Sequence, residues 1–162
     1  MTFGFVLLST GIFAQKQTVF AYMDYNNFFR SFKDGYFNQV DHQAVSGLAY
    51  GDEVIAYYNN QRDFKIYDGT FSRVMTNQPA TFKISDHLAV WNIGPLLYYY
   101  ESGKPHNLTS FGGDYWVTDS LITFQDTRYN SLNVVYHGKI STLMQSATDL
   151  PAPVVQDDNL VV

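Results

Sequence analysis

The chain repeats itself with a period of about 34 residues, and this repeat limits the folds that it can adopt. Four glycines recur at spacings of 34, 34 and 35 residues: Gly35, Gly69, Gly103 and Gly138. Three aspartates recur at spacings of 34 and 33 residues: Asp52, Asp86 and Asp119. A fixed period of this length is typical of solenoids, propellers and other arrays, in which each repeat is one supersecondary unit.

Apolar residues hold fixed places within the period. Two places after the residue that opens each unit, which is Thr18 in the first, stand Phe20, Val54, Leu88 and Leu121. Five places after it stand Met23, Tyr57, Trp91 and Phe124, and three places before each glycine stand Phe32, Ile66, Tyr100 and Val135. Agreement in several columns at once indicates a structural repeat, and we expect these columns to form the core.

The residue types within each unit favour strands over helices. Segments 54–58, 88–91, 121–124 and 132–136 are rich in β-branched and aromatic residues, which suit a pleated sheet. Turn-forming residues separate them, as in Asn-Asn-Gln-Arg at 59–62. Each unit is therefore predicted to be a β-meander, whose fourth strand is SGLAY, ATFKI or DYWVT, just before the next aspartate.

The period divides the chain into four units and the start of a fifth. The units are residues 16–51, 52–85, 86–118 and 119–157. Residues 158–162, Asp-Asn-Leu-Val-Val, match the opening of a unit and are interpreted as a truncated fifth repeat. Half of an apolar strand would leave an unpaired edge, so the sequence is interpreted as a fragment of a longer repeat protein.

Residues 1–15 are predicted to be a secretory signal peptide. They have an apolar centre and a small residue, Ala14, near their end, and they are shorter than the about 20 residues of a membrane span. No Lys or Arg precedes the apolar centre, so a buried first strand stays open as the alternative. The prediction places the protein outside the cytoplasm, either secreted or periplasmic in the cell envelope, with no transmembrane span in the mature chain.

Four-stranded units of this kind resemble β-propeller blades, and the nearest pattern is the WD40-like repeat of TolB-type propellers. Val54-Ile55-Ala56-Tyr57, Ile66-Tyr67-Asp68-Gly69 and Leu108-Thr109 match that pattern. Its opening Ser-Pro-Asp-Gly turn is reduced here to Ser85-Asp86 and Thr118-Asp119. The resemblance implies an all-β chain that forms a partial β-propeller of about four four-stranded meander blades. A β-solenoid or a stacked-meander array stays open as the alternative architecture.

Composition excludes several classes of function. The net charge is −5 and no basic block occurs, which argues against a nucleic-acid partner. The absence of Cys removes thiolate metal sites and cysteine nucleophiles. The four His residues form no metal-binding pattern, and no phosphate-binding glycine motif is present. We therefore predict no catalytic residue, no metal site and no cofactor.

The repeated polar positions and the aromatic runs are the candidate site residues. We interpret seven positions as structural turns: Gly35, Gly69, Gly103, Gly138, Asp52, Asp86 and Asp119. The runs at 98–100 and 115–116 break strand alternation, so some of their rings must leave the core face. Packing between blades is the favoured interpretation of these rings, and a binding role for Tyr98, Tyr99, Tyr115 and Trp116 is the alternative that makes them candidate site residues.

Three hypotheses for function follow. The first is an exported, non-enzymatic repeat protein that binds a protein or a glycan through loop rims or exposed aromatic residues. The second is a fragment of a propeller-scaffold carbohydrate-active enzyme, for which the acids outside the repeat are the candidates: Asp24, Asp63, Glu101, Asp114 and Asp126. The third is a structural spacer of a larger exported protein. In each case the remaining blades of the parent protein, or a second copy by self-association, are expected partners.

Overall fold

The computed structural model describes residues 18–33, 35–42, 45–156 and 159–161. Within these ranges the chain forms seventeen β-strands and no helix. The predicted signal peptide at 1–15 lies outside the described residues, as do residues 158 and 162 of the predicted fifth repeat.

The strands form five antiparallel sheets, each a meander of strands that follow one another in sequence. Sheet A holds β1 (Phe20–Met23), β2 (Phe29–Lys33) and β3 (Tyr36–Asp41). Sheet B holds β4 (Ser46–Tyr50), β5 (Ile55–Tyr58), β6 (Phe64–Tyr67) and β7 (Ser72–Thr76). Sheet C holds β8 (Thr81–Ile84), β9 (Ala89–Ile93), β10 (Leu96–Glu101) and β11 (Lys104–Thr109). Sheet D holds β12 (Gly112–Val117), β13 (Leu121–Asp126), β14 (Ser131–Tyr136) and β15 (Lys139–Gln145), and sheet E holds β16 (Val154–Gln156) and β17 (Asn159–Val161).

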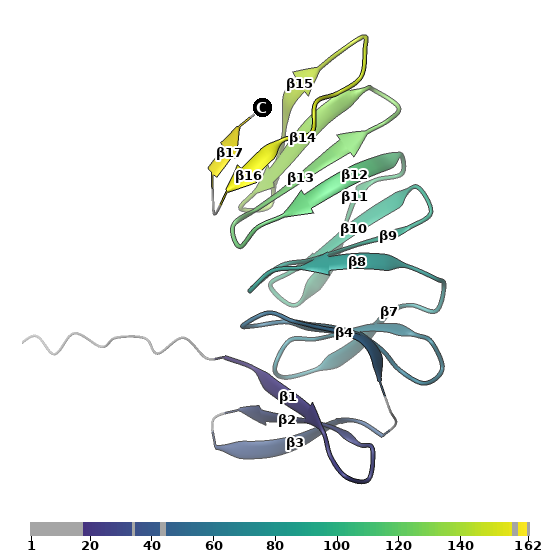
Figure 1. Ribbon diagram of the computed structural model, residues 1–162, viewed down its shortest axis with the longest axis vertical. Helices are drawn as coiled ribbons and strands as arrows, with labels where there is room; N and C mark the ends of the chain where they lie inside the picture. Colours follow the sequence, from purple (N-terminus) through teal and green to yellow (C-terminus); the bar gives the residue numbers. More distant parts are fainter. Residues whose placement is uncertain (1–17, 34, 43–44, 157–158, 162) are drawn as a thin grey trace, which may run out of the picture.

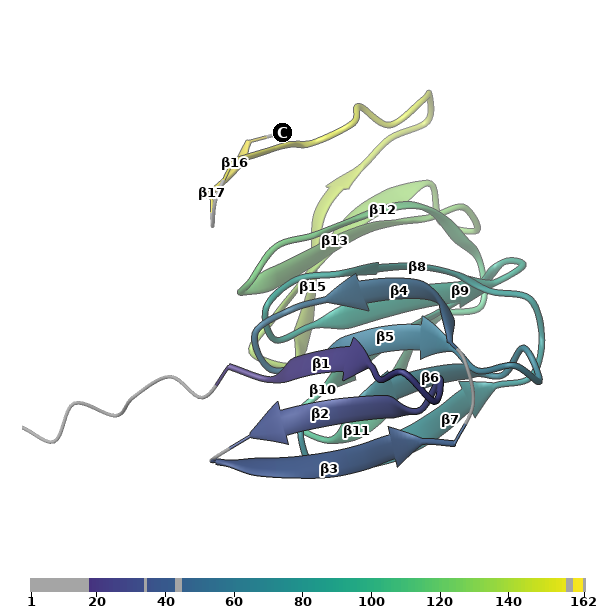
Figure 2. The same ribbon diagram turned by 60° about the horizontal axis from the view of Figure 1, so that its bottom comes forward.

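Sheets A, B, C and D stack face to face in chain order, from sheet A at the purple end to sheet D in green, and the short yellow sheet E lies next to sheet D (Figures 1 and 2). The first strand β8 contacts the first strands β4 and β12 of its neighbours, whereas the last strands β11 and β15 are mainly exposed and β7 is exposed or half-buried. The sheets therefore converge at their first strands, as blades do around the axis of a propeller. This arrangement confirms the predicted all-β fold, a partial β-propeller of meander blades.

Each four-stranded sheet begins before the aspartate that opens the sequence unit. The segments SGLAY, ATFKI and DYWVT, expected as fourth strands, lie in β4, β8 and β12, which are the first strands of the next sheets. The sheets span residues 46–76, 81–109 and 112–145, out of phase with the sequence units. In a meander every strand pairs with its chain neighbours, so a period alone does not tell which strand starts a sheet.

The repeated glycines and aspartates lie in turns that recur from sheet to sheet. All four glycines have positive φ angles, with values of 84°, 81°, 81° and 71°. The turn between the first two strands of sheets B, C and D is closed by N–H groups of Gly51, Ser85 and Thr118, which donate to carbonyl oxygens of Val54, Leu88 and Leu121. Each repeated aspartate directly follows the donor of this turn.

The aspartate turns also join neighbouring sheets. The N–H of Val19 donates to the carbonyl oxygen of Asp52 at 2.7 Å, and the N–H of Glu53 donates to the carbonyl oxygen of Asp86 at 2.7 Å. At the next junction the Asp119 carboxylate accepts the N–H of Asp86 at 3.1 Å. The repeated position therefore serves a repeated structural need, which is the junction between blades.

The core consists of the spaces between sheets. We name the side of a sheet that faces the following sheet its forward face, and the opposite side its backward face. Between sheets A and B lie Val19, Ala21, Phe29, Ile55, Tyr57 and Tyr67. Between sheets B and C lie Val54, Ala56, Phe64, Ile66, Ala89, Trp91 and Tyr100, and between C and D lie Leu88, Val90, Leu97, Tyr99, Leu108, Tyr115, Ile122, Phe124 and Val135. The central strands are therefore apolar on both faces.

The first unit is shifted by one residue against the columns expected from sequence. Val19, and not Phe20, is buried with the core as Val54 is. Tyr22, and not Met23, pairs with Arg30 in the way that Tyr57 pairs with Lys65. Because strands buried on both faces carry no alternation, the hydrophobic pattern does not reveal a slip of one residue.

Candidate functional site

The structure separates the four aromatic residues that are candidates for ligand binding. Tyr99 and Tyr115 are buried between sheets C and D, so neither ring is available to a ligand. Tyr98 is half-buried and stacks on Trp91, with ring centroids 5.6 Å apart and planes at 16°. Trp116 is half-buried in β12. A binding role for Tyr98 and Trp116 stays a prediction.

Two candidate acids, Asp24 and Asp126, lie at the same turn in different sheets, between β1 and β2 in sheet A and between β13 and β14 in sheet D. Asp24 accepts N–H bonds from Asn26 and Phe28 at 2.8 and 3.0 Å. Asn59 holds the equivalent place in sheet B, where it accepts the N–H of Asp63 at 2.8 Å. Asp126 accepts N–H bonds from Arg128 and Tyr129 in sheet D. These side chains cap turns, a repeated column that the sequence analysis missed because it mixes Asp with Asn.

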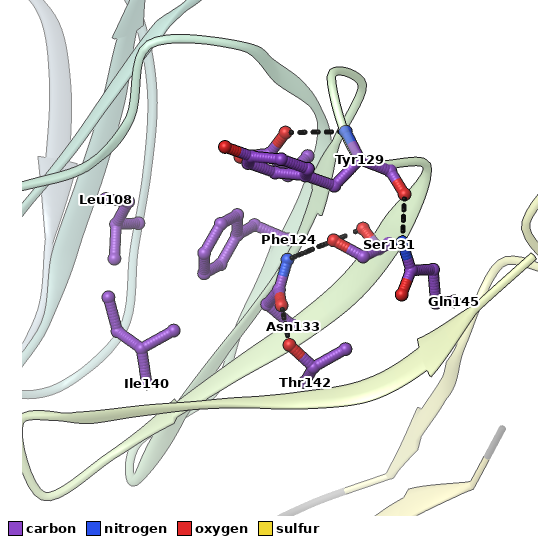
Figure 3. Close-up of a pocket in the computed structure, with 9 residues that line it drawn as sticks. Leu108, Phe124, Tyr129, Ser131, Asn133, Ile140, Thr142 and Gln145 are labelled. Carbon is purple, nitrogen blue, oxygen red and sulfur yellow. Dashed lines mark hydrogen bonds between the residues drawn. The ribbon is translucent and has the colours of Figure 1, made fainter.

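A cavity of about 270 Å³ lies between sheets C and D, on the backward face of sheet D. Leu108 of β11 forms one side, and the other lining residues come from sheet D: Phe124, Asp126, Tyr129, Ser131, Asn133, Ile140, Thr142 and Gln145 (Figure 3). The lining therefore combines an apolar part with a group of amides and hydroxyls. No sequence motif marks this set, because its members come from four strands.

Hydrogen bonds fix the polar side of the cavity (Figure 3). The Asn133 amide donates to the Ser131 hydroxyl at 3.0 Å and accepts from the Thr142 hydroxyl at 2.8 Å. The Gln145 amide donates to the Tyr129 carbonyl oxygen at 3.1 Å. The Asp126 carboxylate accepts the Thr109 hydroxyl of sheet C at 2.6 Å, which ties the two sheets together beside the cavity.

The cavity exists because one column of the repeat carries a short side chain in sheet D. Asn133 pairs with Phe124, as Tyr98 pairs with Trp91 in sheet C and Lys65 with Tyr57 in sheet B. Tyr98 fills the space by stacking on Trp91, and Lys65 fills it by reaching Asp41 of sheet A at 2.7 Å. Asn133 is too short to do either. The signal in the sequence is this one small polar residue in a column of large side chains.

A second feature is an aromatic surface on the backward face of sheet A. We name it the open face, and it consists of Phe20, Tyr22, Phe32 and Phe37. Phe20 and Phe37 are 61% and 65% exposed. The rings contact one another, with centroids 6.2 Å apart for Phe20–Tyr22, 6.4 Å for Tyr22–Phe37 and 4.9 Å for Phe32–Phe37. Among the described residues, no sheet covers this face.

In sheets B, C and D the positions of Phe20, Tyr22 and Phe32 are buried, whereas the position of Phe37 is half-buried or exposed. Phe20 corresponds to Ile55, Ala89 and Ile122, and each of these three is at most 1% exposed. Tyr22 corresponds to Tyr57, Trp91 and Phe124, which are also buried. In each case the forward face of the preceding sheet covers them. The open face is therefore built like a surface that receives a blade.

Buried tyrosines and charges supply the polar contacts between blades. Burial raises the pKa of Tyr57 well above its usual range, and its hydroxyl bonds Ser72 at 2.6 Å and Asp41 at 3.3 Å. Burial also raises the pKa of Tyr115, whose ring lies 4.6 Å from the Lys83 ammonium. That ammonium donates to the Tyr115 carbonyl oxygen at 2.6 Å. These tyrosines stay neutral hydrogen-bond donors at physiological pH.

In the part of the chain that the structure describes, no group of three or more His, Asp or Glu side chains is placed to hold a metal ion. The same residues contain no helix that is long and apolar enough to cross a membrane.

Comparison with known proteins gives a matching family model and similar solved structures. The family model of the 10-bladed beta propeller domain matches residues 13–162. A comparison with curated proteins finds no match. Among solved structures, Kluyveromyces lactis Hsv2 (complete loop 6CD) is similar at 11% identity and a TM-score of 0.49, over 87% of this chain and 54% of that one. The computationally designed Ika8 protein is similar at 11% identity and a TM-score of 0.43, over 91% of this chain and 52% of its own. The chain spans about half the length of these structures.

Proposed function

Because the chain belongs to the family of 10-bladed β-propeller domains, we propose that it is an exported, non-enzymatic binding module that associates with another protein through the open face. A propeller fold suggests a binding or scaffolding role. The observation that carries the proposal is the open face itself, where Phe20 is 61% exposed although its counterparts in sheets B, C and D are all buried. A contiguous exposed aromatic surface of this kind is typical of a protein interface.

The occupant that we propose for the open face is a second copy of this chain. Elsewhere in the molecule, the surface that covers these positions is the forward face of one of the chain's own sheets. On sheet A that face presents Val19, Ala21 and Phe29, small and aromatic residues that interlock with Ile55 and Tyr57. Within each copy the forward faces of sheets A, B and C are already covered, so the second copy would present the far end of its stack, at sheets D and E. The contact is head-to-tail, so it either closes a ring or extends a fibre.

Light scattering coupled to size-exclusion chromatography tests this association, with the chain at concentrations up to roughly 100 μM. We expect a discrete oligomer that Phe20→Ser together with Phe37→Ser returns to monomer. Both rings are largely exposed, so the double variant should fold. Tyr36→Ser is the matched control, because Tyr36 is 73% exposed on the other side of the same hairpin. A monomeric wild type, or an oligomer that survives both serines, contradicts the proposal.

Export to the cell envelope or the medium rests on the apolar N-terminal segment 1–15. Expression of the chain with its own N-terminus, followed by intact mass measurement of the exported protein, tests it. We expect a product that starts near residue 15 or 16. A full-length product retained in the cytoplasm contradicts export.

The hydrogen bonds of three candidate acids support the proposed absence of enzymatic activity, because each acid is engaged within a turn. Asp24 and Asp126 hold turn N–H groups in sheets A and D, and Asp63 bonds the Asn59 amide in sheet B at 3.0 Å. A glycosidase needs two carboxylates facing one bond, about 5–10 Å apart. Assays with nitrophenyl glycosides should detect no hydrolysis. Activity that is lost on Asp126→Asn would revive the carbohydrate-active enzyme alternative.

The assignment to TolB-type, WD40-like propellers also stays a proposal. Its support is that the matching segments 54–57, 66–69 and 108–109 lie on or beside β5, β6 and β11, at the strand and turn positions of a blade.

A further inference from the structure

We propose that the cavity between sheets C and D binds one ring of a neutral saccharide. The cavity and the open face lie on different sheets, D and A, so this site is independent of the proposed self-association.

The first argument is that the hollow is specific to one interface of a repeating structure. Tyr98 and Lys65 fill the corresponding space at the other two interfaces between sheets. A larger residue at position 133 would have closed it here. The hollow lacks the side-chain contacts that fill the other two interfaces, so a ligand seated here would make the contacts that Tyr98 and Lys65 make there.

The second argument is that the cavity wall is polar where a core would be apolar. Ser131 and Asn133 are 5% and 7% exposed, and each keeps hydrogen-bonding capacity that its protein partners do not use. Within the part of the chain that the structure describes, the Asn133 oxygen accepts one hydrogen bond, from Thr142, and the Thr142 hydroxyl can itself accept one. Buried polar groups are costly unless they find partners. A ligand with hydroxyl groups supplies both donors and acceptors.

The third argument is the division of the lining into two kinds of surface. Leu108, Phe124 and Ile140 form the apolar part, while Asn133, Thr142 and Gln145 form the polar part (Figure 3). A sugar ring has the same division, because its C–H groups form an apolar face and its hydroxyls project around the edge. The C–H groups are weakly positive and suit the negative face of an aromatic ring.

The charges beside the cavity favour a neutral ligand. Both oxygens of the Asp126 carboxylate have partners, the Thr109 hydroxyl on one and two N–H groups of its own turn on the other. An anionic ligand would meet this carboxylate without a cation in the lining. The Arg128 guanidinium lies over the rings of Phe111 and Tyr129, at 5.2 and 5.4 Å from their centroids.

The size limits the ligand to a single ring. Small-molecule pockets commonly span roughly 300–1,000 Å³, so a cavity of about 270 Å³ suits one pyranose and not a chain of them. Tyr129 is 58% exposed beside it and can contact a second ring outside. The end of a glycan therefore fits better than its middle.

The test is a titration of the full chain with methyl glycosides of glucose, galactose, mannose and N-acetylglucosamine, followed by saturation-transfer NMR and calorimetry. Galacturonate, glucosamine and inorganic phosphate serve as charged probes. We expect at least one neutral glycoside to bind. Asn133→Tyr, which copies Tyr98 of sheet C, should weaken that binding by about tenfold or more without lowering the melting temperature, since it fills the hollow.

Two further variants keep the test decisive. Asn38→Tyr adds the same ring on exposed β3 and should leave the affinity unchanged. Thr142→Val removes one hydroxyl from an exposed position, so it should fold and weaken binding severalfold even where Asn133→Tyr does not fold. The proposal is overturned if no neutral glycoside binds, if only a charged probe binds, or if Thr142→Val or a folded Asn133→Tyr binds like the wild type. None of these results bears on self-association, which light scattering measures separately.

Discussion

The Tyr100 hydroxyl of sheet C donates a hydrogen bond to the Asp68 carboxylate of sheet B over 2.8 Å. Asp68 lies directly before Gly69 in the turn between β6 and β7. Its carboxylate there also accepts the N–H groups of Thr70 and Phe71. Burial alone would raise the pKa of Asp68, but the Phe71 N–H and the Tyr100 hydroxyl bring that pKa below its usual value. A turn that the sequence signals as local is therefore also a contact between blades.

Tyr100→Phe should lower the free energy of unfolding by about 1–2 kcal/mol, because it deletes the hydroxyl and leaves the packing of the ring unchanged. Urea denaturation followed by circular dichroism measures the change. Tyr36→Phe is the control, since Tyr36 is largely exposed and its loss should cost less than about 0.5 kcal/mol. Equal stability of wild type and Tyr100→Phe would show that the bond contributes nothing.

The hydrogen bond between Tyr100 and Asp68 should make the stability of the fold fall at alkaline pH. Burial, followed by the Asp68 hydrogen bond, raises the pKa of Tyr100 to about 12, against about 10 in an unfolded chain. A raised pKa means that the contribution of Tyr100 is complete below pH about 10 and is lost as the pH rises toward 12. Denaturation at a series of pH values should show a decline over this window that is shallower in Tyr100→Phe. A decline of the same slope in both proteins would assign the effect to other tyrosines.

Gly51→Ala should destabilise the protein by more than about 3 kcal/mol, because an added Cβ would lie 2.0 Å from the Ser85 carbonyl oxygen of the next sheet. Sheets B and C would have to move apart to remove this steric clash. The comparison is Gly103→Ala, where no atom lies within 4 Å and only the positive φ of 81° is unfavourable, at about 1 kcal/mol. Melting temperatures rank the two variants. A milder effect at Gly51 than at Gly103 would contradict the close approach of the sheets.

Lys65→Met should cost about 2 kcal/mol of stability. It leaves the Asp41 carboxylate, whose side chain is 13% exposed, without the cation that now lies 2.7 Å away. A double-mutant cycle with Asp41→Asn measures the coupling between the two side chains. Lys139→Met, at an exposed position of β15, is the control and should be close to neutral. Additive effects of the Lys65 and Asp41 changes would rule out the ion pair as a link between sheets A and B.

Much of the fold follows from the sequence because the repeat imposes the same local chemistry four times. The turns after β2, β6, β10 and β14, with Asp-Gly, Ser-Gly or His-Gly, need a residue that tolerates positive φ, and all four glycines adopt it. The sequence does not show which strand begins each sheet, because a repeat period has no defined starting point. The segment SGLAY, for example, pairs with the strand that follows it. The exposed Phe20 was expected in the core, and Val19 takes its place.

The sequence by itself determined the period, the strand-forming segments and the turn residues, because each depends on local backbone preference and residue type. The tertiary structure alone decided which side chains meet across sheets. Asn133 is unremarkable between Leu132 and Val134, and it borders a cavity only because sheet C presents Leu108 opposite a residue too short to reach it. Contacts of this kind depend on the distance between two sheets, which no single strand specifies.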